Sequence, residues 1–186
     1  MEVMKVKVLS VALALLLCGG AYGQSLSVSA NAVDCANMGT LNVEMGWAFS
    51  KSWSVTAGVK YNPFTFGRDE SVSYRKQRTF DAGVRFWPWH CYSGWWVSAK
   101  ARYQEFCNTG SRSARPSEGD RVGAGLSGGY SYMLTPFLNL DLGLGLWGGR
   151  EVYTAYSCPH CGDVVEKGSR IFVLPSDVMV ALAFIF

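Results

Sequence analysis

Long apolar runs are scarce in this sequence of 186 residues. The longest lies at residues 8–17 and is well short of the ~18–20 residues that a membrane-spanning helix requires. Charged side chains are also scarce, at 17% of the chain against ~25% in typical soluble domains. The net charge of +3 is small and the basic residues are scattered, which argues against a nucleic-acid partner. Only two histidines are present, which limits the enzymatic chemistry available.

The N-terminal segment has the three parts of a secretory signal peptide. Lys5 and Lys7 precede an apolar run at residues 8–18, and Ala21 and Gly23 form a small-x-small cleavage site. This pattern predicts that residues 1–23 are removed and that the mature protein, residues 24–186, lies outside the cytoplasm. The alternative is a lipoprotein signal that uses Cys18, although a bulky leucine precedes it where a small residue is needed.

Glycine is abundant, with 21 residues, and the mature chain has a hydrophobic period of two. At residues 137–146, leucines at every second position alternate with asparagine, aspartate and glycine, which is the pattern of a strand with one apolar face. A helix would scatter these leucines around its surface. The same alternation predicts eight strands, at residues 25–34, 41–49, 53–61, 80–86, 95–104, 121–132, 137–146 and 177–186.

Strand lengths and connections predict an all-β fold, an eight-stranded antiparallel up-and-down transmembrane β-barrel. About ten residues suffice for a tilted strand to cross a membrane. Short connections at residues 50–52, 87–94 and 133–136 alternate with longer ones at 62–76, 108–119 and 151–169, and a brief first loop lies near 35–38. This asymmetry is typical of an outer-membrane barrel whose N and C termini are periplasmic and whose long loops face outward.

The cost of placing charge in lipid decides which strand face points outward. Each arginine or lysine on the lipid face costs about 2–4 kcal/mol near the midplane, so the apolar faces are predicted to meet lipid. The polar faces then fill a narrow lumen, where buried charges must be paired. The sequence therefore predicts a closed lumen with an internal charge network, made of Glu44, Lys60, Asp81, Arg85, Lys100, Arg102, Arg121, Asp141 and Asp177.

Aromatic side chains cluster at the strand ends next to the short turns, where a membrane barrel carries an interfacial girdle. The alternative is a soluble β-sandwich or lipocalin-like barrel in which these aromatics form the core. The glycine- and serine-rich polar face suits a narrow interior better than a solvated exterior, which favours the membrane barrel. The girdle is predicted to contain Trp47, Phe49, Trp53, Phe86, Trp89, Trp95, Phe137 and Phe186.

In architecture the sequence resembles small eight-stranded outer-membrane barrels of the OmpA type, and more specifically a family of outer-membrane proteins of unassigned function from Gram-negative anaerobes. The resemblance rests on residues 61–66, 84–87, 129–132 and 158–162, and on a final strand that ends at Phe186. It implies location in the outer membrane of a Gram-negative bacterium and insertion by the barrel assembly machinery, with Phe186 as the assembly signal. It also suggests a link to surface fimbriae or OmpA-like proteins, and it supplies no catalytic residues.

The pair Cys158 and Cys161 is the sharpest local motif. Two thiolates at this spacing can share a zinc ion or form a disulfide. In an oxidising compartment the disulfide is favoured and no cofactor is expected. Zinc is the alternative, with Cys35, Cys107 or His160 as further ligands. The mature chain keeps 6 − 1 = 5 cysteines, so at least one is unpaired, and Cys91 is the expected one.

Two alternatives concern the predicted outward loops. Ser157, His160 and Asp163 could support a lipid-modifying enzyme, because such hydrolases place a histidine beside a nucleophile near the outer rim. Basic residues at 68–78 and 112–115 could contact lipopolysaccharide phosphates, or could form a merely solvated loop. The favoured prediction is a monomeric, non-enzymatic barrel that anchors structure or mediates surface interactions through its loops. A secreted soluble barrel that binds a small apolar ligand is the third alternative.

Overall fold

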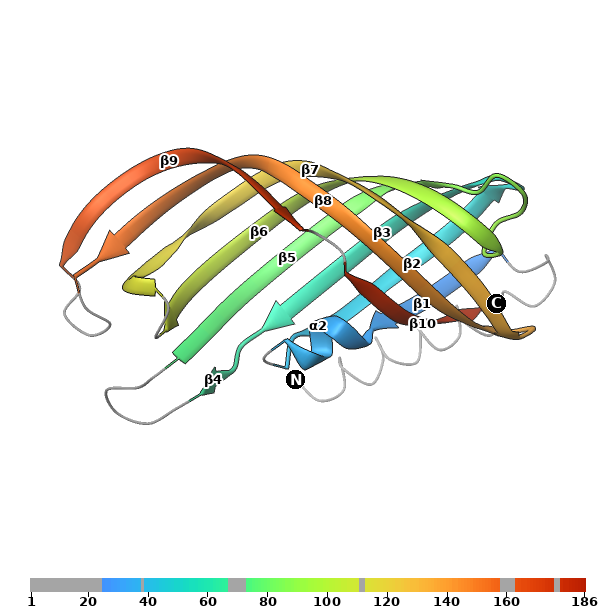
Figure 1. The fold of residues 1–186 in the computed structure, drawn as a ribbon, viewed down its shortest axis with the longest axis horizontal. Coiled ribbons are helices and arrows are strands. Elements are labelled where there is room, and N and C mark those ends of the chain that lie inside the picture. Colours follow the sequence, from blue (N-terminus) through green and yellow to red (C-terminus); the bar gives the residue numbers. More distant parts are fainter. Residues whose placement is uncertain (1–24, 38, 67–72, 111–112, 158–162, 176–177) are drawn as a thin grey trace, which may run out of the picture.

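A computed structural model describes residues 25–37, 39–66, 73–110, 113–157, 163–175 and 178–186. Antiparallel strands make up almost all of this part of the chain (Figure 1). No helix in it is long and apolar enough to cross a membrane. The elements are β1 (Leu26–Asn31), α2 (Ala32–Ala36), β2 (Leu41–Ser50), β3 (Trp53–Asn62), β4 (Thr65–Phe66), β5 (Ser73–Phe86), β6 (Gly94–Gly110), β7 (Ser113–Thr135), β8 (Leu138–Tyr156), β9 (Val164–Pro175) and β10 (Met179–Ile185).

The strands close into an eight-stranded antiparallel barrel, which confirms the predicted all-β, up-and-down barrel architecture. Strands that follow one another in the chain are neighbours in the sheet, as expected for an up-and-down topology. β4 lies along β5 beyond the end of β3, and β9 and β10 both lie along β8, so that each of these pairs forms one interrupted barrel strand (Figure 1). β10 pairs with β1 from Ser27↔Ile185 to Asn31↔Ala181, and this seam closes the barrel.

The two faces of each strand follow the alternation in the sequence. In β10, Val180 and Leu182 are exposed while Ala181 and Ala183 are buried. On β7 and β8, Leu126 and Leu144 point outward and are 67% and 69% exposed. The apolar set therefore covers the outside of the barrel, and the polar set lies within it.

The strands at one end of the barrel run far into segments that the sequence predicted as long loops. β6 ends at Gly110 and β7 begins at Ser113, while β8 ends at Tyr156 and β9 begins at Val164. The predicted loops at residues 108–119 and 151–169 are therefore wrong over most of their length, and the one at residues 62–76 is wrong at Asn62, Thr65–Phe66 and residues 73–76. Polar side chains occupy both faces of these extensions, so the apolar period of two disappears although backbone pairing continues.

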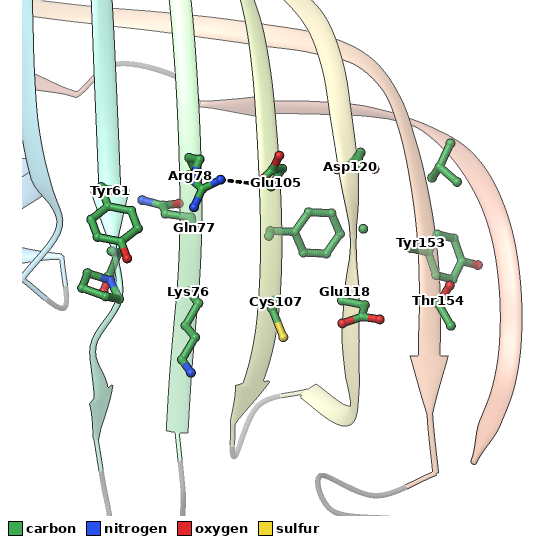
Figure 2. A pocket seen from close by; sticks show the side chains of 15 residues that line it. Tyr61, Lys76, Gln77, Arg78, Glu105, Cys107, Glu118, Asp120, Tyr153 and Thr154 are labelled. Carbon is green, nitrogen blue, oxygen red and sulfur yellow. Dashed lines mark ion pairs between the residues drawn. The ribbon is translucent and has the colours of Figure 1, made fainter. Parts of the chain in front are cut away.

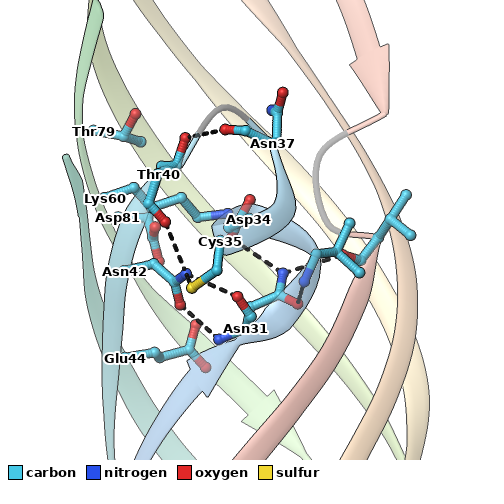
Figure 3. A network of polar contacts seen from close by, with 12 residues as sticks. Asn31, Asp34, Cys35, Asn37, Thr40, Asn42, Glu44, Lys60, Thr79 and Asp81 are labelled. Atoms are coloured by element: carbon cyan, nitrogen blue, oxygen red, sulfur yellow. Dashed lines mark hydrogen bonds and ion pairs between the residues drawn. The ribbon is translucent and has the colours of Figure 1, made fainter. Parts of the chain in front are cut away.

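The prediction of a first strand over residues 25–34 is wrong at its end, because the strand stops at Asn31. The Asn31 side-chain oxygen accepts hydrogen bonds from the backbone N–H groups of Val33, at 3.2 Å, and Val180, at 3.0 Å. Its side-chain nitrogen donates to the carbonyl oxygen of Val178 at 3.1 Å. Asn31 thus caps helix α2 and joins it to β10 (Figure 3).

Glycines make room for one large side chain inside the barrel. Trp96, Gly129 and Gly143 lie side by side on β6, β7 and β8. The indole of Trp96 is 1% exposed and packs over both glycines. A Cβ atom on Gly143 would lie 2.8 Å from two ring carbons of Trp96. The narrow interior therefore requires the absence of a side chain at this position.

We expect Gly143→Ala to destabilise the folded barrel by about 1–3 kcal/mol, because a buried ring in a packed interior would have to shift. Gly128→Ala is the matched control, since its Cβ would meet the nearest atom, the Trp96 carbonyl oxygen, at an ordinary 3.5 Å. Denaturant unfolding of both variants measures the difference. Equal free energies of unfolding for the two variants would contradict this account of the packing.

Candidate functional site: the charged interior

Ion pairs cross the barrel interior between β2, β5, β6 and β8. Arg85 lies at their centre, with Nη2 at 2.8 Å from Oε1 of Glu44 and Nη1 at 3.3 Å from Oδ2 of Asp141. The ammonium group of Lys100 forms a second ion pair with the Glu44 carboxylate. The side chains of Arg85 and Asp141 are each 5% exposed. Charges this deeply buried are stable only when they are paired, which the arrangement achieves.

Asp81 extends this network along β6. Its two carboxylate oxygens lie 3.8 Å from the Lys100 ammonium and 3.8 Å from the Arg102 guanidinium. One carboxylate thus serves two cations, as Glu44 does. The structure therefore brings six of the predicted lumen residues into one network of alternating charge, Glu44, Asp81, Arg85, Lys100, Arg102 and Asp141.

Two further predicted lumen charges, Lys60 and Arg121, pair with carboxylates that the sequence analysis did not name. Lys60 points inward but pairs with Asp34 of α2 at 2.7 Å (Figure 3). Arg121 pairs with Glu151 at 2.7 Å, and Glu151 also contacts Arg170 at 2.9 Å. Asp177 lies outside the described residues.

The sequence analysis missed three residues of the interior. Asn31 caps α2, and Asp34 and Glu151 supply carboxylates to the ion pairs. Asn31 and Asp34 carry a usable signal, because asparagine followed three residues later by an acidic residue is typical of a helix start. Glu151 carries none, because it stands in a segment without an apolar period. Its position on β8 follows only from pairing with β7 and β9.

Aromatic side chains pack across the interior beneath the ion pairs, at the end with the short turns. The segment between β5 and β6 folds back into the barrel, so that Trp87 is fully buried and Tyr92 is 7% exposed. The Trp87 indole N–H donates to the Ser54 hydroxyl at 3.0 Å. The Arg85 guanidinium lies 4.2 Å above the ring centre of Trp96. We call Trp87, Tyr92 and Trp96 the aromatic plug; the sequence predicted only a plain turn at residues 87–94.

Cys91, the residue expected to be unpaired, is buried beside the aromatic plug. Its thiol donates to the backbone oxygen of Ser50 at 3.1 Å, and burial raises the pKa of this thiol to about 11. It forms no disulfide with the described residues. Since the thiolate is the reactive form, this thiol is protonated and inert at neutral pH.

We expect a variant that keeps only Cys91 to react with maleimide at pH 8 more slowly, by roughly two orders of magnitude, than a free thiol of ordinary pKa ~8.5. A variant that keeps only the exposed Cys35 is the control and should react rapidly. Labelling followed by mass spectrometry measures both rates, before and after unfolding. Rapid labelling of native Cys91 would contradict its burial.

The exterior near the short turns carries the predicted aromatic girdle. All eight of its members are exposed, from 37% for Phe86 to 69% for Trp89. Phe186 lies at the seam, where its backbone N–H donates to the Leu26 oxygen at 2.8 Å and its ring stays 42% exposed. The final residue is therefore held by β1, with its side chain on the outer surface.

The opposite end of the barrel carries charge. A pocket of about 600 Å³ is formed there by β3, β5, β6, β7 and β8 (Figure 2). In its lining, Arg78 on β5 and Glu105 on β6 lie side by side at 3.6 Å, with side chains 54% and 45% exposed. Asp120 follows Glu105 in the next strand of the same row. This surface is mixed in charge, and exposed pairs of this kind contribute about 0–1 kcal/mol each.

Several predicted site residues lie outside the described residues, namely Cys158, Cys161 and His160. Within the part of the chain that the structure describes, no three histidine, cysteine, aspartate or glutamate side chains are grouped to hold a metal ion. Cys35 lies in α2, where its sulfur accepts a hydrogen bond from the Asn42 amide at 3.5 Å, and Cys107 lies in β6.

Comparison with known proteins gives one match. The family model described as "Protein of unknown function (DUF3575)" matches residues 9–186 of the chain. No curated protein and no solved structure matches the chain.

Proposed function

The chain belongs to the DUF3575 family of proteins of unknown function, and on that premise we propose that it is an integral outer-membrane barrel with a closed lumen. In this proposal the barrel is a non-enzymatic anchor, and the charged strand extensions opposite the short turns mediate interactions at the cell surface. Residues 1–23 act as the cleaved signal peptide, and both termini face the periplasm.

The outer wall is the observation that carries the membrane proposal. From the aromatic girdle to the level of Ala101 and Ala124, every outward-facing position of the described strands is uncharged, and Arg150, which pairs with Val122, stands in the next row. Along β7 this band runs from Tyr132 to Ala124, a span of eight residues. At ~3.3 Å per residue and a tilt of ~40°, its height is about 20 Å, close to the ~25 Å of the apolar band of outer-membrane barrels. A soluble monomer rarely exposes so continuous an apolar surface.

The interior supports the closed lumen. Ion pairs join opposite walls through Arg85, and the aromatic plug fills the cross-section below them. A charged interior also argues against the alternative of a soluble barrel that binds a small apolar ligand. Ion permeation would require the buried pairs around Arg85 to separate, at a cost of several kcal/mol.

The two ends of the barrel carry different side chains, and in this proposal each end meets different partners. Lys76 and Arg78, beyond the apolar band, are placed to meet lipopolysaccharide phosphates. The exposed ring of Phe186 is available to the barrel assembly machinery as an assembly signal. A surface or fimbrial protein would bind the strand extensions.

Membrane fractionation and electrophoresis test the proposal. The protein should float with outer-membrane vesicles and should migrate differently before and after boiling, and planar bilayers that contain it should show no steady conductance. A soluble protein without a heat-dependent shift would refute the membrane barrel, and steady conductance would refute the closed lumen. Hydrolysis of membrane lipid by the purified protein would favour the enzyme alternative instead.

A further inference from the structure

A cavity of about 370 Å³ lies inside the barrel, between the Arg85 network and the ends of the long strands. At ~30 Å³ per molecule it has room for about a dozen waters, or for one small solute. It is distinct from the aromatic plug, which lies at the other end of the interior. Its wall comes from α2 and from every long strand from β3 to β9.

Three cations and one carboxylate line this cavity, namely Lys60, Arg102, Arg121 and Asp34. Asp34 pairs with Lys60. The carboxylates that pair with the two arginines, Asp81 and Glu151, do not line the cavity. Counted over the described residues alone, the wall therefore carries a net charge of +2.

Each of those carboxylates is also shared with a further cation. Asp81 contacts Lys100 as well as Arg102, both at 3.8 Å, and Glu151 contacts Arg170 as well as Arg121. Their negative charge is thus divided, and the side chains of the described residues compensate the positive potential at the wall only in part. A water-filled recess with low-dielectric walls concentrates such a potential.

Uncharged donors complete the wall. Gln104 donates to Gln77 at 2.9 Å and accepts from Arg121 at 3.2 Å, so the amides and the guanidinium form one ordered chain. The Arg121 guanidinium also lies 4.0 Å above the Phe106 ring, which fixes its plane. Guanidinium groups held in place in this way suit the oxygens of phosphate or carboxylate groups.

We propose that this interior cavity binds a small solute that carries two or more negative charges on phosphate or carboxylate oxygens. Lys60, Arg102 and Arg121 would contact the anionic groups, and the side-chain amide of Gln77, one N–H of which donates to Thr40, would donate its other N–H to them. The cavity volume limits the ligand to a small molecule and excludes a polymer. The proposal is independent of membrane insertion, because it depends on the barrel interior alone.

Titration of the purified full chain with inorganic pyrophosphate, in a neutral detergent, tests the proposal. We expect saturable binding that weakens as salt is raised. Arg102→Gln should raise the Kd about tenfold or more, as expected from loss of a hydrogen bond to a charged group. Arg150→Gln is the matched control, because Arg150 points outward and donates to Ser169; its Kd should equal that of the parent.

Absence of saturable binding would overturn the proposal, and so would equal Kd values for the Arg102 and Arg150 variants. If Arg102→Gln does not fold, Gln104→Glu replaces it, since this change adds a carboxylate to the wall and should weaken binding in the same way. Binding by a protein that fails to float with membranes would refute the proposed location and support the cavity. Vesicles of phosphatidylglycerol and of phosphatidylcholine distinguish the source: competition by the former alone would identify a lipid headgroup as the anion.

Discussion

Leu144→Arg is expected to destabilise the inserted barrel by about 2–4 kcal/mol and to reduce the folded fraction sharply. Leu144 lies midway along the uncharged part of β8, points outward and is 69% exposed. In a membrane this position meets hydrocarbon, where an arginine carries its full depth-dependent cost. In water the same exposed position would accept arginine with little effect on stability. The substitution therefore separates a membrane barrel from a soluble one.

Val152→Arg is the matched control on the same strand. Val152 also points outward, is 55% exposed, and lies directly beside Asp120, beyond the apolar band. We expect a change in the free energy of unfolding within about 0.5 kcal/mol. Equilibrium unfolding from lipid vesicles, read by the gel shift between unboiled and boiled samples, measures both variants. Two equal changes would count against the proposed position of the membrane.

Arg85→Met is expected to cost about 3–5 kcal/mol, the second large effect. Arg85 contacts both Glu44 and Asp141, and its removal takes away the counter-charge that it supplies to these buried carboxylates. Methionine preserves much of the side-chain volume, so the lost charge dominates the change in stability. Loss of the contact over the Trp96 ring adds a smaller contribution.

Arg78→Met provides the comparison, because it makes the same substitution on the same strand. Arg78 pairs with Glu105 at 3.6 Å, but both side chains are about half exposed. Water already screens this pair, so its loss should cost about 0–1 kcal/mol. Denaturant titration gives both values, and similar costs for the two variants would show that the Arg85 network is not shielded from solvent.

The barrel and the direction of its side chains could be predicted because the two faces of each strand carry different kinds of side chain. Along residues 137–146 leucines alternate with polar residues and glycine, and β8 exposes Leu142, Leu144 and Leu146 while it buries Asn139 and Asp141. The inward position of Arg85 followed from the same alternation. Periodicity is informative wherever the two strand faces meet different surroundings.

The same rule explains what could not be predicted. Beyond the apolar band both faces of β7 carry polar residues, as at Asp120 on the outside and Arg121 on the inside, so no period marks the strand. The alternation of apolar and polar residues also does not show which charged side chains form ion pairs. Lys60 pairs with Asp34 only because Asn31 ends β1 and starts a short helix, which moves Asp34 over the barrel interior. Long-range pairing, not local pattern, decides such contacts.

The seam between β1 and β10 has a consequence for the order of folding. Ser27 pairs with Ile185, 158 residues further along the chain, and β1 is only six residues long. The pairings from β1–β2 to β7–β8 join neighbouring strands along the chain, so they can form without β9 and β10, which make up the last barrel strand. Until the last strand arrives, the molecule is a curved sheet with two bare edges, which is the form most prone to self-association. Closure of the barrel is thus the last step of folding, and a nascent chain must be kept from contact with other copies until that step is complete.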